Sequence, residues 1–203
     1  MIIDVNNIIK NMGNSPSPVV LDIGCGPRKK DIASIGIDVL QFPGVDIVGD
    51  VHEVLALLPD GSVDRIYSSH FMEHLIELGA LIRELERVLK PGGELRVIVP
   101  HFSNPYFYSD PTHKTPFGLY TFCYFAECDL FSRKVPSYGH KAVLKLEKVS
   151  LLFKSSPPFY VRYGFKRVAQ WFVNLFTYNQ EFYEDMLTGI ISCYEIDFLL
   201  VKK

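Results

Sequence analysis

Two glycines and two acidic residues in the first quarter of the chain stand where strands are expected to end. Gly24 and Gly26 come at the end of the apolar run 19–23 (VVLDI), and Asp38 and Asp50 end the next two runs. A glycine after a buried strand lets the backbone turn sharply and lets a ligand approach where a Cβ would clash. An acid at the end of the following strand can accept both hydroxyls of a ribose. The pattern predicts a nucleoside site at the carboxyl edge of a parallel sheet.

Four histidines are the other residues that could do chemistry near that edge. His70 and His101 end the later runs VDRIYSSH and LRVIVPH, His74 follows His70 by four residues, and His113 lies in DPTHK. Because imidazole is the most common general base, His113, His70 and His101 are the candidate catalytic residues. We expect no metal site, since no set of Cys and His residues with metal-ligand spacing accompanies them. His74 is explained more simply as a buried, hydrogen-bonded residue.

Alternating strands and helices are expected to position these residues. The helix at 72–90 is amphipathic, because its apolar residues recur every three or four positions, and Lys90-Pro91-Gly92-Gly93 would end it. Alternation of this kind predicts an α/β fold, a parallel sheet with helices on both faces. The expected strands are 19–23, 34–39, 45–48, 63–69, 95–99, 142–153 and 193–201, and the expected helices are 54–58, 72–90 and 165–176, the last with its apolar stripe packed in the core.

Residues 102–141 differ from the rest of the chain and are called the insert below. They are rich in aromatic residues and prolines, and a helix is possible at 115–127. The insert follows the strand 95–99, so it begins at the carboxyl edge, where a long loop is expected to cover or line the ligand site. Tyr106 and Tyr108 are therefore candidate substrate-binding residues.

The segment DPTHK (110–114) is the most distinctive part of the insert. Pro111 rigidifies the backbone, and Asp110 can accept hydrogen bonds from the loop's own amides. A fixed turn of this kind would present His113 and Lys114 outward, with His113 as a base and Lys114 as an anchor for an anionic substrate. The alternative is a self-capping turn in which His113 is hydrogen-bonded for structural reasons.

Length and composition are those of a single soluble domain, residues 1–203. The chain is 48% hydrophobic and 22% charged, and its net charge of −2 argues against general attraction to nucleic acid. Residues 103–170 carry a net charge of +6, which suits an anionic acceptor. The four cysteines form no C-x-x-C pair, no signal peptide is recognisable, and no apolar run reaches the ~18 residues of a membrane span. We therefore expect a cytoplasmic protein of unknown oligomeric state.

The motif Asp22-x-Gly24-x-Gly26, followed by Asp38, resembles the opening of class I S-adenosylmethionine (SAM) dependent methyltransferases, in particular the type 11 group. Three later features also resemble that class: Asp50 at the end of a strand, the stretch 63–70, and the turn 89–95. The resemblance implies a Rossmann-like, seven-stranded, mostly parallel sheet with an antiparallel last strand. It also implies SAM as cofactor, held by Asp22, Gly24, Cys25, Gly26, Asp38, Val39, Asp50, Val51, Ser69 and His70.

Two departures from the class pattern stand out in the first turn. Arg28 occupies the place of the third glycine, and only seven residues separate Gly26 from Ser34, too few for the helix that usually follows. The carboxylate of SAM would then meet Arg28 or Lys29 rather than a helix amino terminus, unless these residues form only a solvated basic loop.

The function that this resemblance implies is methyl transfer from SAM to an unidentified, small or anionic acceptor. A catalytically inactive SAM-binding or scaffold protein is one alternative. A nicotinamide-dependent oxidoreductase fits less well, because the turn does not read G-x-G-x-x-G and no tyrosine is followed four residues later by lysine.

Overall fold

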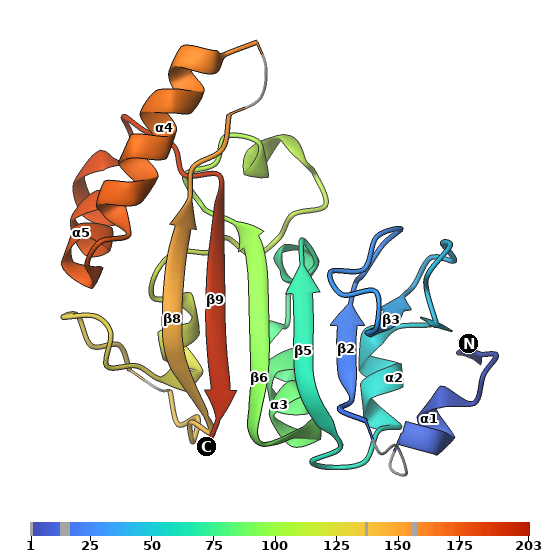
Figure 1. Ribbon diagram of the computed structural model, residues 1–203. Coiled ribbons are helices and arrows are strands. Elements are labelled where there is room, and N and C mark those ends of the chain that lie inside the picture. Colours follow the sequence, from blue (N-terminus) through green and yellow to red (C-terminus); the bar gives the residue numbers. More distant parts are fainter. Residues whose placement is uncertain (1, 13–16, 137, 156–157) are drawn as a thin grey trace.

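A twisted nine-stranded sheet runs through the protein (Figure 1). The structure is a computed structural model that describes residues 2–12, 17–136, 138–155 and 158–203. The strand order is β1-β4-β3-β2-β5-β6-β9-β8-β7. The strands are β1 (Ile3–Asp4), β2 (Val20–Ile23), β3 (Ile35–Asp38), β4 (Ile47–Val48), β5 (Val63–Ser69), β6 (Leu89–Pro100), β7 (Ala126–Glu127), β8 (Leu144–Leu152) and β9 (Glu195–Lys202).

The sheet confirms the predicted α/β class. Strands β4, β3, β2, β5 and β6 are parallel, and β9 lies antiparallel between β6 and β8. The seven predicted strands are all present, and β1 and β7 add two residues each at the two edges. Because the five parallel strands end at the same edge, their carboxyl ends bring residues from distant parts of the chain together.

Two of the predicted helices are shorter and less regular than predicted. The predicted helix 72–90 is divided, since Leu75 and Leu89 both have extended backbones; β6 begins at Leu89. The predicted helix at 115–127 is wrong apart from one 3₁₀ turn, because the backbone of Phe117 pairs with His101 and Phe102 at the end of β6 instead. The helices are α1 (Ile8–Asn11), α2 (Val51–Ala56), α3 (Leu78–Val88), α4 (Tyr160–Val173) and α5 (Thr177–Phe182), which continues as a π-helical turn (Tyr183–Leu187); 3₁₀ turns lie at Met72–His74, Phe107–Ser109 and Thr121–Tyr124.

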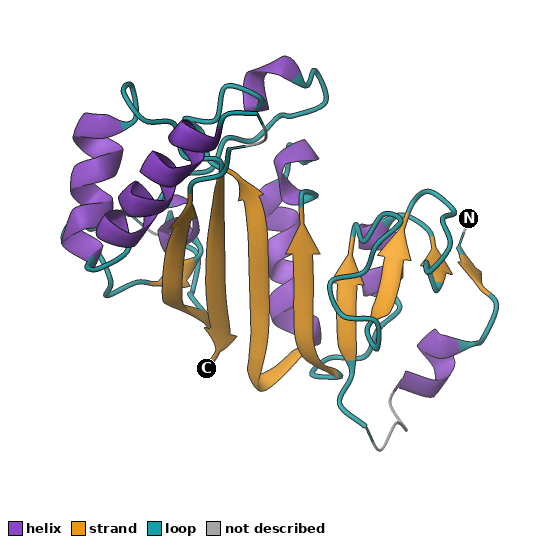
Figure 2. Cartoon of the chain, turned by 45° about the horizontal axis from the view of Figure 1, so that its top comes forward, coloured by secondary structure: helices purple, strands orange, loops and turns teal. Residues whose placement is uncertain are grey.

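Helices α2 and α3 cover only one face of the sheet (Figures 1 and 2). The opposite face of β5, β6 and β9 carries no helix among the described residues; Arg96 is exposed there and pairs with Asp197 at 2.7 Å. The prediction of helices on both faces therefore does not hold for the centre of the sheet. The physical reason is the short connection from β2 to β3, which contains turns but no helix.

Helix α4 is also placed differently from the prediction. It begins at Tyr160, five residues earlier than expected, and the apolar stripe that includes Val168 and Trp171 is exposed rather than packed in the core. The polar side of the helix contacts the protein instead, since Gln170 and Asn174 hydrogen-bond to the backbone of Phe153 and Leu151. Among the described residues, no helix is long and apolar enough to cross a membrane.

Candidate functional site

The glycine turn after β2 has the left-handed backbone that glycine allows. The φ angles are 63° at Gly24 and 55° at Gly26, and the amides of Gly24 and Cys25 both donate to the carbonyl of Ile37, at 2.9 and 3.3 Å. A Cβ on Gly24 would lie 2.6 Å from the side chain of Phe71, whereas the space beside Gly26 is open. Gly24 is therefore required by a contact within the protein, and Gly26 is the glycine that leaves room for a ligand.

Asp38 joins the two loops that border this open space. Its Oδ2 accepts from the amide of Gly26 at 2.8 Å, and its Oδ1 accepts from the amide of Leu40 at 2.9 Å. A carboxylate has about four acceptor positions, so the half-buried Asp38 keeps capacity for two further donors. The backbone bonds hold the carboxylate at the strand end, and Val39 beside it is exposed. This arrangement fits the hydroxyls of a ribose.

Asp50 and Val51 lie at the start of α2, on the next strand end along the sheet edge. Asp50 caps the helix, because its Oδ1 accepts from the amides of His52 at 2.9 Å and Glu53 at 3.3 Å. Its carboxylate is exposed, but the side chain of Val51 is buried in the core. A ligand at this strand end would therefore meet Asp50 directly and only the backbone of Val51.

Asp22 lies beneath the β2–β3 loop. It is buried and accepts from the amide of Lys30 at 2.6 Å, and burial raises its pKa. Lys29 is engaged within the loop through an ion pair with Asp46 at 2.9 Å, so it is not placed for a ligand carboxylate. Cys25 is buried as well, and desolvation raises the pKa of its thiol to about 12.

Lys30 lines a cavity of about 270 Å³ beside the end of β5. Arg96 contributes a second cation, and Ser69 is the predicted site residue in its wall; the full lining is Lys30, Tyr67, Ser68, Ser69, Arg96 and Ile98. Sequence analysis named Arg28 and Lys29 but not Lys30 or Arg96. The alternation of apolar and polar residues around Arg96 could have indicated its position. It places the Arg96 side chain on the face of the sheet that no helix covers at β5 and β6.

His70 has a strained backbone and a charged ring. Its φ of 55° is unusual for a residue other than glycine. Nε2 lies 3.0 Å from Oε1 of the buried Glu195, and Nδ1 lies 3.4 Å from Oε1 of the buried Glu73. The hydrogen-bonded carboxylate of Glu195, and then the nearby carboxylate of Glu73, raise the pKa of His70 to about 9. The ring is therefore protonated at neutral pH and is not available to accept a proton.

His101 is fully buried, and both of its ring nitrogens have partners. Nδ1 lies 2.8 Å from the hydroxyl of Ser103, and Nε2 lies 3.1 Å from Oε2 of Glu184. These contacts hold His101 between the sheet and the turn that follows α5, where its ring is not accessible to solvent.

The DPTHK segment packs against the turn at 72–75. The amides of Lys114 and Thr115 both donate to the carbonyl of Glu73, at 2.7 and 3.0 Å, and Asp110 accepts from the amide of Thr112 at 2.8 Å. Asp110 thus fixes the turn as the sequence suggested. The side chain of His113 is only 11% exposed and points inward, contrary to the expectation that it faces outward, because its Nδ1 bonds the carbonyl of Phe107.

The other predicted acceptor residues lie on the surface of the insert. Lys114 is exposed, with Nζ 3.0 Å from the carbonyl of Pro111. Tyr106 and Tyr108 are also exposed, and the hydroxyl of Tyr108 donates to the carbonyl of Phe102. The roles of these residues stay predictions.

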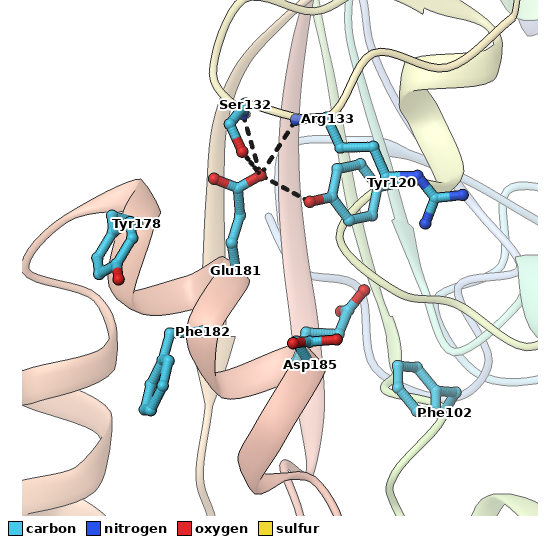
Figure 3. Close-up of a pocket in the computed structure, with 9 residues that line it drawn as sticks. Phe102, Tyr120, Ser132, Arg133, Tyr178, Glu181, Phe182 and Asp185 are labelled. Carbon is cyan, nitrogen blue, oxygen red and sulfur yellow. Dashed lines mark hydrogen bonds between the residues drawn. The ribbon is translucent and has the colours of Figure 1, made fainter.

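A larger cavity, of about 540 Å³, lies between the insert and α5 (Figure 3). Glu181 closes one side, since its Oε1 accepts from the hydroxyl of Tyr120 at 2.7 Å and from the amide and hydroxyl of Ser132 at 3.0 and 2.8 Å. None of the residues predicted from the sequence lines this cavity, whose walls are Phe102, Tyr120, Ser132, Arg133, Tyr178, Glu181, Phe182, Glu184 and Asp185.

Comparison with known proteins agrees with this geometry. A protein-family model described as a methyltransferase domain matches residues 31–97. A SAM-dependent methyltransferase from Archaeoglobus fulgidus superposes with a TM-score of 0.57 at 21% identity, over 98% of this chain and 91% of that one. At this identity the likeness concerns the fold.

Two curated proteins are similar over part of their length. An uncharacterized 37.1 kDa protein in transposon TN4556 of Streptomyces fradiae is 31% identical over 104 residues, which are 39% of this chain and 29% of that protein. The sterol 24-C-methyltransferase of Yarrowia lipolytica is 28% identical over 130 residues, 51% of this chain and 33% of that enzyme. The matches thus span about a third of each relative.

The fold and the family match agree with the order of the sequence motifs. Gly26, Asp38, Asp50 and Ser69 lie at or just after the carboxyl ends of β2, β3, β4 and β5. The chain therefore has the fold of a SAM-dependent methyltransferase, and its residues 31–97 match a methyltransferase-domain model.

Proposed function

We propose that this chain transfers a methyl group from SAM to a small or anionic acceptor. The observation that carries the proposal is the carboxylate of Asp38, which two backbone amides hold at the open strand edge with acceptor capacity to spare. The open space beside Gly26 adjoins it, and the exposed Asp50 lies at the end of the neighbouring strand. This arrangement fits a nucleoside with a ribose and an amino-bearing base.

Each part of the site would have a separate task. Asp38 would hold the ribose, Asp50 would accept from the adenine amino group, and Lys30 with Ser69 would receive the amino-acid end. The charged His70 beside Ser69 adds positive potential there. Bound SAM supplies the methyl from its positively charged sulfonium, so the protein has mainly to hold the acceptor atom in line with it, about 3–3.5 Å away.

Charge and position support an anionic acceptor. Lys114 is an exposed cation on a segment that is fixed against the turn at 72–75, which follows β5 at the sheet edge. If the acceptor carries a proton, a base must remove it. Of the three candidate histidines, His70 is charged, and both ring nitrogens of the buried His101 have partners. His113 is the remaining candidate, because only its Nδ1 makes a hydrogen bond and its Nε2 lies 3.7 Å or more from the nearest carboxylates.

Replacing Lys114 with alanine should raise KM for the acceptor about tenfold, because one charge-assisted hydrogen bond is lost. SAM affinity and melting temperature should stay unchanged, since the Lys114 side chain is exposed. The measurement is transfer of a labelled methyl from SAM to a panel of phosphorylated and carboxylated small molecules, with products identified by mass. Lys10→Ala, at an exposed position in α1, is the matched control.

The outcomes separate the proposals. SAM binding without transfer to any acceptor in the panel or in a cell extract would favour the inactive scaffold and contradict methyl transfer. An unchanged KM in the Lys114→Ala protein would contradict the assigned anchor but not the reaction.

A further inference from the structure

Glu73 is a buried carboxylate without a hydrogen bond. Its side chain is 1% exposed, and neither Oε1 nor Oε2 has a hydrogen-bond partner. A carboxylate in this position is costly unless a cation or a donor compensates it. The ring of His70 lies 3.4 Å from Oε1 but outside hydrogen-bond geometry, so both oxygens of Glu73 keep their lone pairs.

Two histidine rings next to Glu73 are held with one nitrogen free. Nδ1 of His113 lies 3.0 Å from the carbonyl of Phe107, which can only accept, so Nδ1 carries the proton. The hydroxyl of Thr112 donates to Asp110 at 2.6 Å, so its oxygen accepts from Nδ1 of His74 at 3.0 Å. In the neutral ring, a proton on Nδ1 leaves a lone pair on Nε2, the form in which imidazole binds metals.

The three side chains converge on one point. One ligand atom from each of Glu73, His74 and His113 lies within 4.8 Å of the others. Nε2 of His113 is 4.0 Å from Oε1 of Glu73 and 3.7 Å from Oδ2 of Asp110. A cation placed between Nε2 and these two carboxylates would be attracted by all three groups. Ligands of one zinc ion, at about 2.0–2.2 Å from it, lie somewhat closer together than these atoms do, so a small contraction would complete the site.

We propose that Glu73, His74 and His113 bind a divalent cation of the Zn²⁺ type. Two imidazoles and one carboxylate are ligands that Zn²⁺ accepts, and this set leaves a fourth position open. The contacts from Phe107 and Thr112 to the far ring nitrogens are the kind that orient metal-binding histidines. The expectation of no metal site rested on histidine and cysteine spacing and overlooked Glu73.

A cation here changes the role of His113. The lone pair on Nε2 cannot serve both a metal and a proton, so the cation site and the base role exclude each other. A bound cation would act as a Lewis acid for an acceptor oxygen at its open position. The metal proposal itself does not depend on methyl transfer, because its readouts below are metal content and stability.

The test uses the full, untagged chain, treated with chelator and then titrated with Zn²⁺ and, separately, Co²⁺. We expect one cation per chain, a Co²⁺ absorption spectrum typical of a four-coordinate site, and a higher melting temperature with Zn²⁺. Glu73→Gln and His113→Asn should each weaken binding at least tenfold, whereas His52→Asn, a half-buried histidine on α2, should bind as the wild type does. Circular dichroism checks that each variant folds. No binding by the wild type, or equal binding by His113→Asn, overturns the proposal.

A second observation, independent of the first, concerns α4. Five apolar side chains at spacings of three and four residues face solvent: Val161 is 90% exposed, Phe165 60%, Val168 65%, Trp171 66% and Phe172 52%. The side that contacts the protein is polar, with Lys166 donating to the carbonyl of Ser192 at 3.0 Å. The usual amphipathic arrangement is thus reversed, and the helix lies at the periphery of the molecule (Figures 1 and 2).

The charges around α4 indicate what covers this apolar side. From residue 148 to residue 180 the chain has no acidic residue and five basic ones: Lys148, Lys154, Arg162, Lys166 and Arg167. Arg162 and Arg167 are exposed on the helix itself. A second copy packed symmetrically on α4 would bring like charges together. Anionic lipid headgroups would complement them, while aromatic rings such as Trp171 suit the interface between headgroups and acyl chains.

We propose that α4 lies on an anionic lipid surface with Phe165, Val168, Trp171 and Phe172 inserted at the headgroup boundary. This is a peripheral contact of one helix face and involves no membrane span.

Trp171 is the only tryptophan of the chain, so its fluorescence reports on the contact directly. With vesicles of phosphatidylcholine and phosphatidylglycerol (7:3), we expect a blue shift and co-sedimentation, both much weaker with phosphatidylcholine alone. Phe165→Ser with Phe172→Ser, and Arg162→Glu with Arg167→Glu, should each reduce binding at least tenfold. Ile32→Ser and Lys10→Glu, exposed positions far from α4, are the matched controls. No shift with the anionic vesicles, equal binding to both vesicles, or a dimer in solution that shields Trp171 overturns the proposal.

Discussion

Asp38→Ala should weaken SAM binding roughly 10- to 150-fold, since a hydrogen bond to a charged group contributes about 1.5–3 kcal/mol. The carboxylate is the group assigned to the ribose, and two backbone amides hold it in place. Its removal also leaves the amides of Gly26 and Leu40 without their acceptor, which loosens both loops that border the site. Titration calorimetry with SAM and with S-adenosylhomocysteine measures the effect.

Asp64→Asn is the matched control for that substitution. Asp64 also accepts from a backbone amide, that of Val19 at 2.8 Å, but it lies at the opposite edge of the sheet, at the start of β5. Its replacement should leave SAM affinity unchanged. If Asp38→Ala binds SAM as tightly as the wild type does, the ribose does not lie at Asp38.

Glu184→Ala should lower the free energy of unfolding by about 2–4 kcal/mol, because two groups lose their acceptor and each unsatisfied buried group costs about 1–3 kcal/mol. Oε2 of Glu184 accepts from the amide of Leu119 at 2.8 Å and lies 3.1 Å from Nε2 of the buried His101. The carboxylate therefore joins the insert and the end of the fifth parallel strand to the turn after α5. Urea denaturation measures the change.

Asp185→Ala tests whether this loss is specific. Asp185 is the next residue on the same π-helical turn and lines the same cavity, but it is exposed. Its replacement should change the free energy of unfolding by less than about 0.5 kcal/mol. Equal destabilisation by the two variants would mean that the turn, rather than the contacts of Glu184, stabilises the insert.

The sheet and the polar residues at its carboxyl edge were predictable because their signals are local. An apolar run that ends in Gly24 or in Asp38 shows both where the strand lies and where it ends, and the structure brings Gly26 and Asp38 into contact. Spacing alone also indicated that the helix after Gly26 is short or missing. The consequence, an uncovered face on which Arg96 lines a cavity, depends on how strands pair across the sheet and was not visible in that segment.

The parts that sequence analysis missed depend on contacts between distant segments. Glu73 appeared to be an ordinary residue of an amphipathic helix, and only the docking of Lys114 and Thr115 onto its carbonyl reveals the cluster with His113. The apolar stripe of α4 has the same spacing as a core stripe. Periodicity identifies an apolar side but not its partner, so exposure of Trp171 required the structure.

The class of the cofactor is the central claim, and calorimetry on the wild-type chain tests it most directly. The arrangement at Gly26, Asp38 and Asp50 predicts that SAM and S-adenosylhomocysteine bind at one site per chain with low micromolar affinity, roughly −8 kcal/mol, and that NAD does not bind. Absence of SAM binding together with binding of NAD would contradict the account and assign the edge to a nicotinamide cofactor.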